Sequence, residues 1–175
     1  MGWRIFGKLW VLSGCDLGGW ALVVKRMTRE IFWELIESVD RKTLETGDEE
    51  SAIEPLQNRL STLAVHELAA FEEHLSQCLY ALDGRIFADE SGESGSSDDA
   101  FLYARCYVVA LGRKHYEATL KNPKLMPKTV DHWCEALLYP HRKAWADITG
   151  MDESEWPFDT SVSYESGSNS ELWPD

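Results

Sequence analysis

The chain has 175 residues, of which 44% are hydrophobic and 27% charged, and this length and composition predict one globular domain with flanking segments. It carries 30 acidic residues against 17 basic ones, a formal net charge of −13. An acidic field of this size repels phosphate backbones and anionic lipid headgroups, so we expect no nucleic-acid partner and no membrane association. A protein partner, and a basic one in particular, is compatible with this charge.

The first 26 residues differ in composition from the rest of the chain, because they hold three of the eight tryptophans and five of the twelve glycines. Leu12-Ser13-Gly14-Cys15 resembles the cleavage site of a bacterial lipoprotein. A signal sequence needs an apolar run of roughly 7–15 residues, and the run before this site is shorter. The regular helical pattern begins only after Met27. We therefore predict that translation starts at Met27 and that residues 1–26 are an extension upstream of the true start.

From Met27 onward the apolar residues recur at helical spacing and predict a single all-α domain over about residues 27–150. Thr28 is placed to cap the first helix, and Gly150 to end the last one. The sequence predicts about six helices, over about residues 28–44, 48–63, 65–82, 98–111, 113–121 and 128–149, with Pro55 at a kink or a late start of the second and a bend near Pro140 in the last.

The helix predicted at 98–111 contains the least polar stretch of the chain, with Arg105 as its one charge between Phe101 and Leu111. A helix that is apolar on every side must be wrapped by other helices, so this one is the predicted centre of the fold. The small polar residues 89–97 before it predict a mobile loop.

Ser96 and Asp99, at the end of that loop, match a capping box at the start of the central helix. At the other end of the domain, residues 151–175 carry seven acidic residues and no basic one, without hydrophobic periodicity. This composition predicts a disordered acidic tail.

The cysteines occur singly, with no C-x-x-C pair, which argues against a zinc knuckle or a disulfide framework. Cys78 and Cys106 lie in apolar helical stretches, where a free thiol behaves as a small hydrophobe in a reducing compartment. We therefore expect a cytoplasmic protein with core cysteines.

Several short motifs resemble the bacterial domain-of-unknown-function family 4240 over about residues 27–150. They are Phe32-Trp33-Glu34-Leu35-Ile36, Ser97-Asp98-Asp99 followed by Phe101, Gly112-Arg113 with Tyr116-Glu117, and Asn122-Pro123. The resemblance implies no activity, cofactor or catalytic residue set, because the family has none established. This chain departs from the many members that carry a Trp- and Gly-rich stretch before Ser-Asp-Asp, since Arg85-Ile86-Phe87-Ala88 and the polar loop stand there instead.

Four side chains near the central helix are candidate ligand or partner contacts: Asp98, Asp99, Arg105 and Arg113. The two aspartates supply oxygen ligands that suit a hard cation, but they lack the pattern of a calcium loop and fit a solvated helix cap better. Arg105 needs a partner, because an unpaired buried charge costs several kcal/mol. No acid stands three or four residues from it, so the partner is expected from another element, as a carboxylate or a ligand anion.

The five histidines show neither the His-Glu-x-x-His pattern of metalloproteases nor the repeated Glu-x-x-His of di-iron bundles. No nucleophile elbow, phosphate-binding loop or dinucleotide fingerprint is present either. We expect no metal and no cofactor.

Three classes of function remain open. The favoured one is a protein-interaction or regulatory module with an acidic surface, including the narrower case of an inhibitor or immunity-type protein against a basic toxin. The second is a metal-dependent or acid–base enzyme that uses Asp98, Asp99 and Arg105 around one pocket. The third is a small-molecule sensor with an apolar cavity and Arg105 as its polar anchor.

Overall fold

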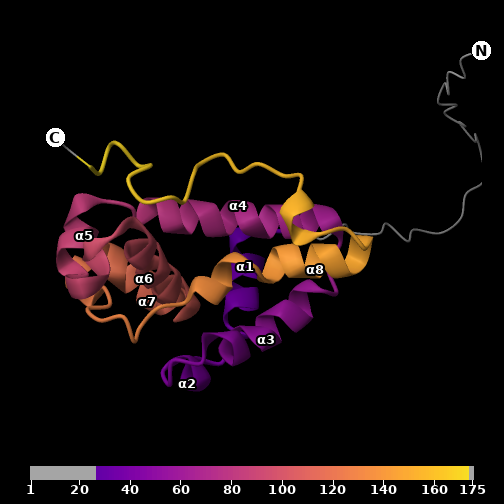
Figure 1. The fold of residues 1–175 in the computed structure, drawn as a ribbon, viewed down its shortest axis with the longest axis horizontal. Coiled ribbons are helices and arrows are strands. Elements are labelled where there is room, and N and C mark those ends of the chain that lie inside the picture. Colours follow the sequence, from indigo (N-terminus) through magenta and orange to yellow (C-terminus); the bar gives the residue numbers. More distant parts are fainter. Residues whose placement is uncertain (1–26, 174–175) are drawn as a thin grey trace, which may run out of the picture.

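A computed structural model of the protein describes residues 27–173, and these residues form helices and no strands (Figure 1). The all-α prediction is confirmed, with eight α-helices in the described part of the chain where about six were expected. They are α1 (Arg29–Ile36), α2 (Arg41–Leu44), α3 (Glu49–Leu60), α4 (Val65–Ala81), α5 (Arg85–Glu90), α6 (Asp98–Ala110), α7 (Arg113–Lys121) and α8 (Pro140–Thr149). The expectation about residues 1–26 lies outside the described residues.

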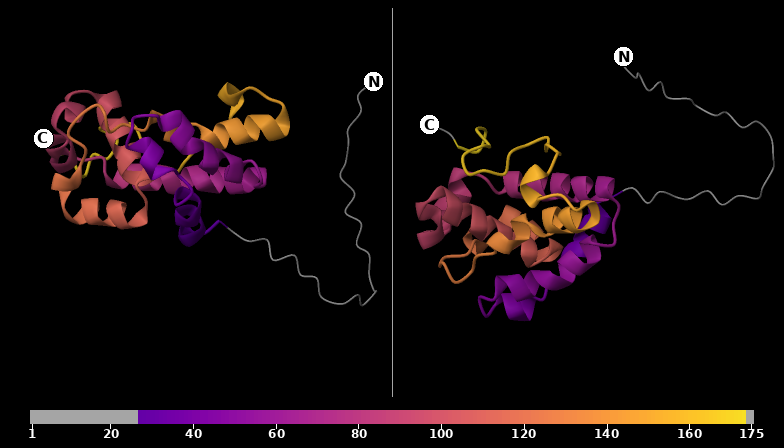
Figure 2. Two further views of the ribbon diagram at one scale, coloured as in Figure 1. Left: turned by 90° about the horizontal axis from the view of Figure 1, so that it is seen from below. Right: turned by 45° about the vertical axis from the view of Figure 1, so that its right-hand side comes forward.

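The 17-residue helix α4 is the longest element, and it lies beside α8 (Figure 1). Helix α3 also packs on α8, and α5, α6 and α7 gather at one end of the molecule. The two further views in Figure 2 show the same grouping, with the C-terminal segment running along α4 toward α5.

The single helix predicted over 28–44 is two helices. Thr28 caps α1 as expected, because its hydroxyl accepts a hydrogen bond from the Ile31 amide at 3.4 Å. The chain then turns after Ile36, and the carboxylate of Asp40 caps α2 through the Lys42 amide at 3.0 Å. An Asp that can bond nearby amides favours a cap over a helix interior, and it starts a new helix here.

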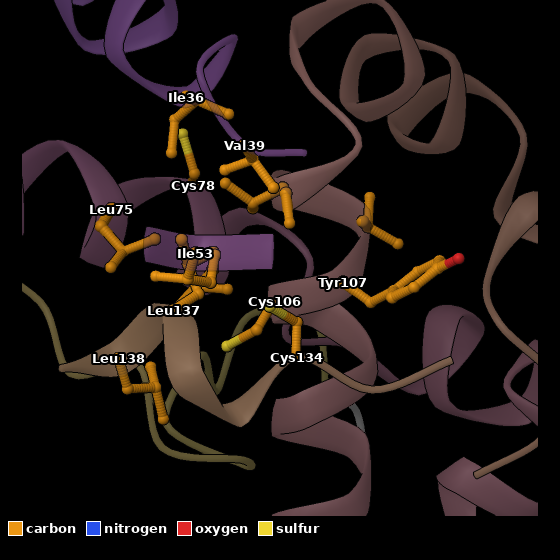
Figure 3. Packing of buried hydrophobic residues seen from close by; sticks show 14 of the residues in the cluster. Ile36, Val39, Ile53, Leu75, Cys78, Cys106, Tyr107, Cys134, Leu137 and Leu138 are labelled. Carbon is orange, nitrogen blue, oxygen red and sulfur yellow. The ribbon is translucent and has the colours of Figure 1, made fainter. Parts of the chain in front are cut away.

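Helix α6 is the buried centre of the fold, as predicted. Every residue from Ala104 to Ala110 is buried, Arg105 included. Figure 3 shows Cys106 of α6 beside Cys134, with Leu137 and Leu138 close by. Both thiols are free and fully buried, which agrees with their expected role as core residues.

The loop expected to be mobile over 89–97 is ordered: α5 continues to Glu90 and a 3-10 turn follows over Gly92–Ser96. Ser94 is buried and accepts a hydrogen bond from Trp133 Nε1 at 3.0 Å. The small hydroxyl side chains thus satisfy polar groups inside a compact turn instead of solvating a loop.

The cap of α6 is one residue later than the predicted capping box. Ser97 Oγ accepts the hydrogen bond from the Ala100 amide at 3.3 Å, whereas the Ser96 hydroxyl donates to the Glu93 carbonyl at 2.6 Å.

The last predicted helix, 128–149, forms only in part. Residues 128–134 are irregular, a 3-10 turn covers Glu135–Leu138, and α8 begins at Pro140. Proline fits the first turn of a helix because the amide that it lacks would have no partner there, so Pro140 starts α8 where a bend was expected. Gly150 ends α8 in the left-handed conformation, at φ 72°, as predicted.

The chain after α8 follows a defined path over residues 151–173, where a disordered tail was expected. A short 3-10 turn over Glu153–Glu155 brings the Trp156 ring against Trp145, with ring centroids 5.7 Å apart. Residues 157–173, here called the C-terminal strap, then run in an irregular path along α4. Aromatic anchors and hydrogen bonds to charged side chains compensate for the low apolar content that made the strap look disordered.

Candidate functional site

The four candidate residues from the sequence do not converge on one site. Asp98 and Asp99 are exposed in the first turn of α6. Arg113 is exposed on α7, where its Nε donates to Glu117 at 2.7 Å. Arg105 alone is fully buried. Among the four, only Arg105 belongs to the polar interior described below.

The partners that the described residues offer Arg105 are two carbonyls and a hydroxyl, with no carboxylate among them, and its Nε has no hydrogen-bond partner in these residues. Nη1 donates to the Leu79 carbonyl at 2.9 Å, and Nη2 donates to the Tyr164 carbonyl at 3.0 Å and to Ser166 Oγ at 2.9 Å. The guanidinium also lies over the Phe101 ring, 4.8 Å from its centroid. Burial lowers the pKa of Arg105, and the nearby Asp83 carboxylate opposes that shift.

Asp83, which follows α4, is the second buried charge and was not identified from the sequence. Its carboxylate accepts hydrogen bonds from the Gly167 amide at 3.0 Å and the Asn169 amide at 2.9 Å. It also accepts from Ser168 Oγ at 3.1 Å and from Trp173 Nε1 at 2.9 Å. All four donors belong to the C-terminal strap, so Asp83 fixes the strap to the end of α4.

Glu72, in the middle of α4, is buried with only 2% of its surface exposed. It accepts hydrogen bonds from Arg142 Nη2 at 2.8 Å and from Trp156 Nε1 at 2.7 Å, and His141 Nε2 lies 3.2 Å from it. Burial opposes the ionisation of Glu72, but contacts with His141, Arg142 and Trp156 outweigh it and lower the pKa to about 2. Burial lowers the pKa of His141. The strap therefore begins, directly after Trp156, beside an ionised carboxylate.

Charged side chains contact the strap along its path beside α4, and the surface that they form is here called the groove. The groove is defined by Glu72, Glu73, Asp83, Arg85, Arg105 and Arg142, all of which contact the strap or the residues just before it. Between the strap and the middle of α4 a pocket of about 300 Å³ remains, lined by Glu72, Arg142, Phe158, Asp159, Thr160, Val162, Ser163, Tyr164 and Glu165.

A second pocket, of about 260 Å³, lies on another part of the molecule, between α6, α7 and the irregular segment that follows them. Its lining is mostly apolar and contains two histidines. The lining residues are Tyr107, Leu111, His115, Leu125, Pro127, Lys128, Thr129 and His132. Arg105 lines neither of the two pockets.

Residues 27–173 contain no group of three or more His, Cys, Asp or Glu side chains placed to hold a metal ion. In the same residues, no helix combines the length and the apolar character needed to cross a bilayer.

The sequence signal for this groove is partial. Arg105 stands out because it is a charge within an apolar helix, whereas Asp83 looks like an ordinary helix end before Gly84 and Glu72 looks like one of several polar residues on α4. The strap residues that bond Asp83 are 84 to 90 positions away in the chain, so no local pattern links them.

No curated protein and no solved structure matches the chain. The profile of one family, described as a protein of unknown function (DUF4240), matches residues 27–156. That match extends six residues past the end expected from the motifs, through Trp156, and leaves the strap outside it. Because it covers most of the chain, the protein belongs to the DUF4240 family.

Proposed function

We propose that this protein is a protein-interaction module whose groove along α4 binds an extended segment of a partner protein, and that the C-terminal strap occupies this groove in the free chain. One observation carries the proposal. Asp83 and Arg105 are buried charges within the family-matched region. Asp83 nevertheless accepts its side-chain hydrogen bonds from residues beyond that region, and Arg105 donates two of its three to residues there.

The groove holds the strap through main-chain atoms as well as through side chains. Asp83 accepts from two strap amides, and Arg105 donates to a strap carbonyl. At the N-terminus of α5, the Arg85 amide donates to the Leu172 carbonyl at 2.9 Å. Main-chain hydrogen bonds give affinity with little dependence on side chains, so a partner segment with a different sequence can use the same contacts.

Selectivity is expected at the end of the strap, where the Trp173 side chain is anchored on three sides. Its Nε1 donates to Asp83, the centroid of its ring lies 5.3 Å from the Arg85 guanidinium, and the Trp173 and Phe101 rings meet edge to face with centroids 6.0 Å apart. Aromatic anchors in buried pockets commonly dominate the binding energy of an interface. The proposed partner segment therefore carries small hydroxyl or glycine residues followed by an aromatic residue.

The net charge adds a preference for the protein that carries this segment. At −13 the molecule attracts basic proteins and speeds their encounter, and a basic toxin is one partner of this kind.

The enzyme hypothesis loses its support, because Asp98 and Asp99 are exposed while the guanidinium of Arg105 is bonded inside the protein. The sensor hypothesis needs Arg105 to bind a small molecule, but its guanidinium is bonded to the strap instead.

The proposal is tested by adding a competing segment to the full chain. A fluorescein-labelled peptide of residues 157–173 is titrated with the wild-type protein and with Gly167→Val, and anisotropy reports binding. Gly167 has φ 83°, where a β-branched residue is strained, and a Cβ there meets no atom within 4 Å. A strain of about 1–2 kcal/mol opens the strap and raises the apparent affinity for the peptide by about 5- to 30-fold.

Gly47→Val is the matched control, because Gly47 also has φ 83° and open space but lies between α2 and α3. It imposes the same backbone strain away from the groove and leaves the peptide affinity at the wild-type value. A peptide with Trp173→Ala binds Gly167→Val more weakly than the original peptide. Equal binding by all three proteins, or no binding by any, contradicts the proposal.

A further inference from the structure

The pocket between α6 and α7 differs in character from the groove and lies apart from the strap. Its apolar wall is formed by Leu111 at the end of α6 and by Leu125 and Pro127 in the segment that follows α7. Leu125 is 41% exposed, so the apolar wall is open to solvent. Apolar pockets with a few polar groups are the usual form of small-molecule sites.

The polar groups of this pocket are supplied by Tyr107, His132 and His115. The Tyr107 side chain points away from the Cys106 and Cys134 thiols (Figure 3), and its ring meets the His132 ring edge-on with centroids 5.2 Å apart. Burial, and then the Glu45 charge, raise the pKa of Tyr107, so its hydroxyl keeps its proton and can donate. His132 is oriented by Thr129, whose Oγ1 lies 3.3 Å from Nδ1.

The charge of the lining is opposite to that of the protein as a whole. No Asp or Glu is among the eight lining residues, although the chain has 30 acidic residues. Lys128 is the lining residue with a permanent charge, and its Nζ bonds the Glu90 carbonyl oxygen and the Glu90 carboxylate. An ammonium has three N–H donors, so these two contacts leave one donor for another acceptor.

We propose that this pocket binds a small apolar monocarboxylate. The carboxylate receives hydrogen bonds from Tyr107, Lys128 and an imidazole, and the apolar body lies against Leu111, Leu125 and Pro127. The site would make the domain responsive to a small organic acid. It does not involve Arg105 or the strap, so it stands or falls independently of the proposed peptide groove.

The test uses benzoate as the probe and the full chain as the protein. Benzoate is titrated while NMR follows the ring C–H signals of His115 and His132, with benzamide as the uncharged isostere. The proposal expects saturable shifts of both rings with benzoate, and binding of benzamide at least about tenfold weaker, because benzamide cannot form a charge-assisted hydrogen bond with Lys128.

Tyr107→Phe removes the hydroxyl and keeps the ring, so benzoate affinity falls by about five- to tenfold. Tyr103→Phe is the matched control: Tyr103 lies on α6 one turn earlier and is not part of this pocket's lining, and its variant binds benzoate as the wild type does. The proposal is overturned if benzoate shifts neither histidine ring, if benzamide binds as tightly as benzoate, or if the two tyrosine variants have the same affinity.

Discussion

Arg105 places a positive charge inside the protein, where a guanidinium without partners would cost several kcal/mol. Carbonyl and hydroxyl acceptors from α4 and from the strap, together with the nearby Asp83 charge, offset that cost. A single side chain thus joins three parts of the molecule that are far apart in sequence.

Replacing Arg105 with Met keeps a long, helix-compatible side chain and removes the charge. We expect Arg105→Met to lower the free energy of unfolding by about 3 kcal/mol or more, because three acceptors lose their donor. Urea denaturation at pH 7 measures the change. Arg113→Met is the control, since Arg113 forms an exposed pair with Glu117 worth less than about 0.5 kcal/mol. Equal losses in the two variants would show that Arg105 is not a structural centre.

Glu72 makes the stability of the protein depend on acidity. Its pKa in the folded protein is about 2, below the ordinary 4.5, so the stabilisation is present above pH 4.5 and is lost as the pH falls toward 2. The His141 pKa is lowered too, so protonating that residue below about pH 6.5 also favours unfolding. Both groups therefore weaken the fold on the acid side.

The Glu72→Gln variant isolates the carboxylate part of this dependence. Between pH 4.5 and 2 the free energy of unfolding of the wild-type protein should fall by up to about 3 kcal/mol more than that of Glu72→Gln. This is the free-energy equivalent of a pKa shift of this size. Urea denaturation at several pH values gives the two curves. Glu54→Gln, at an exposed position of α3, should follow the wild-type curve. Parallel curves for the wild type and Glu72→Gln would exclude Glu72 as the source.

At the scale of elements, local signals predicted the helices well and the connections poorly. The apolar period of α4 and the charge-poor run of α6 are properties of neighbouring residues, and both helices occur where expected. Asp40 and Pro140 each stand at the start of a helix. The apolar pattern does not tell whether such a residue begins a helix or lies inside one, so these two helix starts were missed. The strap could not be predicted, because its order comes from bonds to Glu73, Asp83 and Arg105.

The Asp83 carboxylate is expected to control how often the strap opens. Asp83→Asn removes the charge and turns one acceptor into a donor, so about 2 kcal/mol of strap binding is lost and the open fraction rises about 30-fold. A glutamyl endoprotease that cleaves after Glu165 and Glu171 reports this fraction by mass spectrometry, since cleavage of a briefly opened segment follows its open population.

Asp98→Asn is the control for this experiment, because Asp98 is an exposed acid at the start of α6 and the hydrogen bond that it accepts from Ser166 of the strap uses its main-chain carbonyl. Its cleavage rate should equal that of the wild type. If Asp83→Asn is cleaved no faster than Asp98→Asn, the four hydrogen bonds to Asp83 do not hold the strap.

At the scale of the whole molecule, the strap covers charged residues of a domain whose family match ends just before it. Removing water from these charges requires partners, and the strap supplies them through amides, carbonyls and hydroxyls that another polypeptide also possesses. Because another polypeptide could supply the same groups, we propose an interaction function. Only Arg105 of the candidate site could be predicted from sequence. The other groove residues belong to the site because of contacts with a segment distant in the chain, and no local pattern shows such contacts.

Hydrogen exchange of the full chain tests most directly whether the strap is bound and still able to leave. The amides of Gly167 and Asn169 donate to Asp83, and Val109 lies in the buried helix α6. We predict protected Gly167 and Asn169 amides with opening free energies of about 2–4 kcal/mol, clearly below that of Val109. Exchange of both strap amides at the rate of an unfolded chain, or opening free energies equal to that of Val109, would contradict a releasable strap in a partner-binding groove.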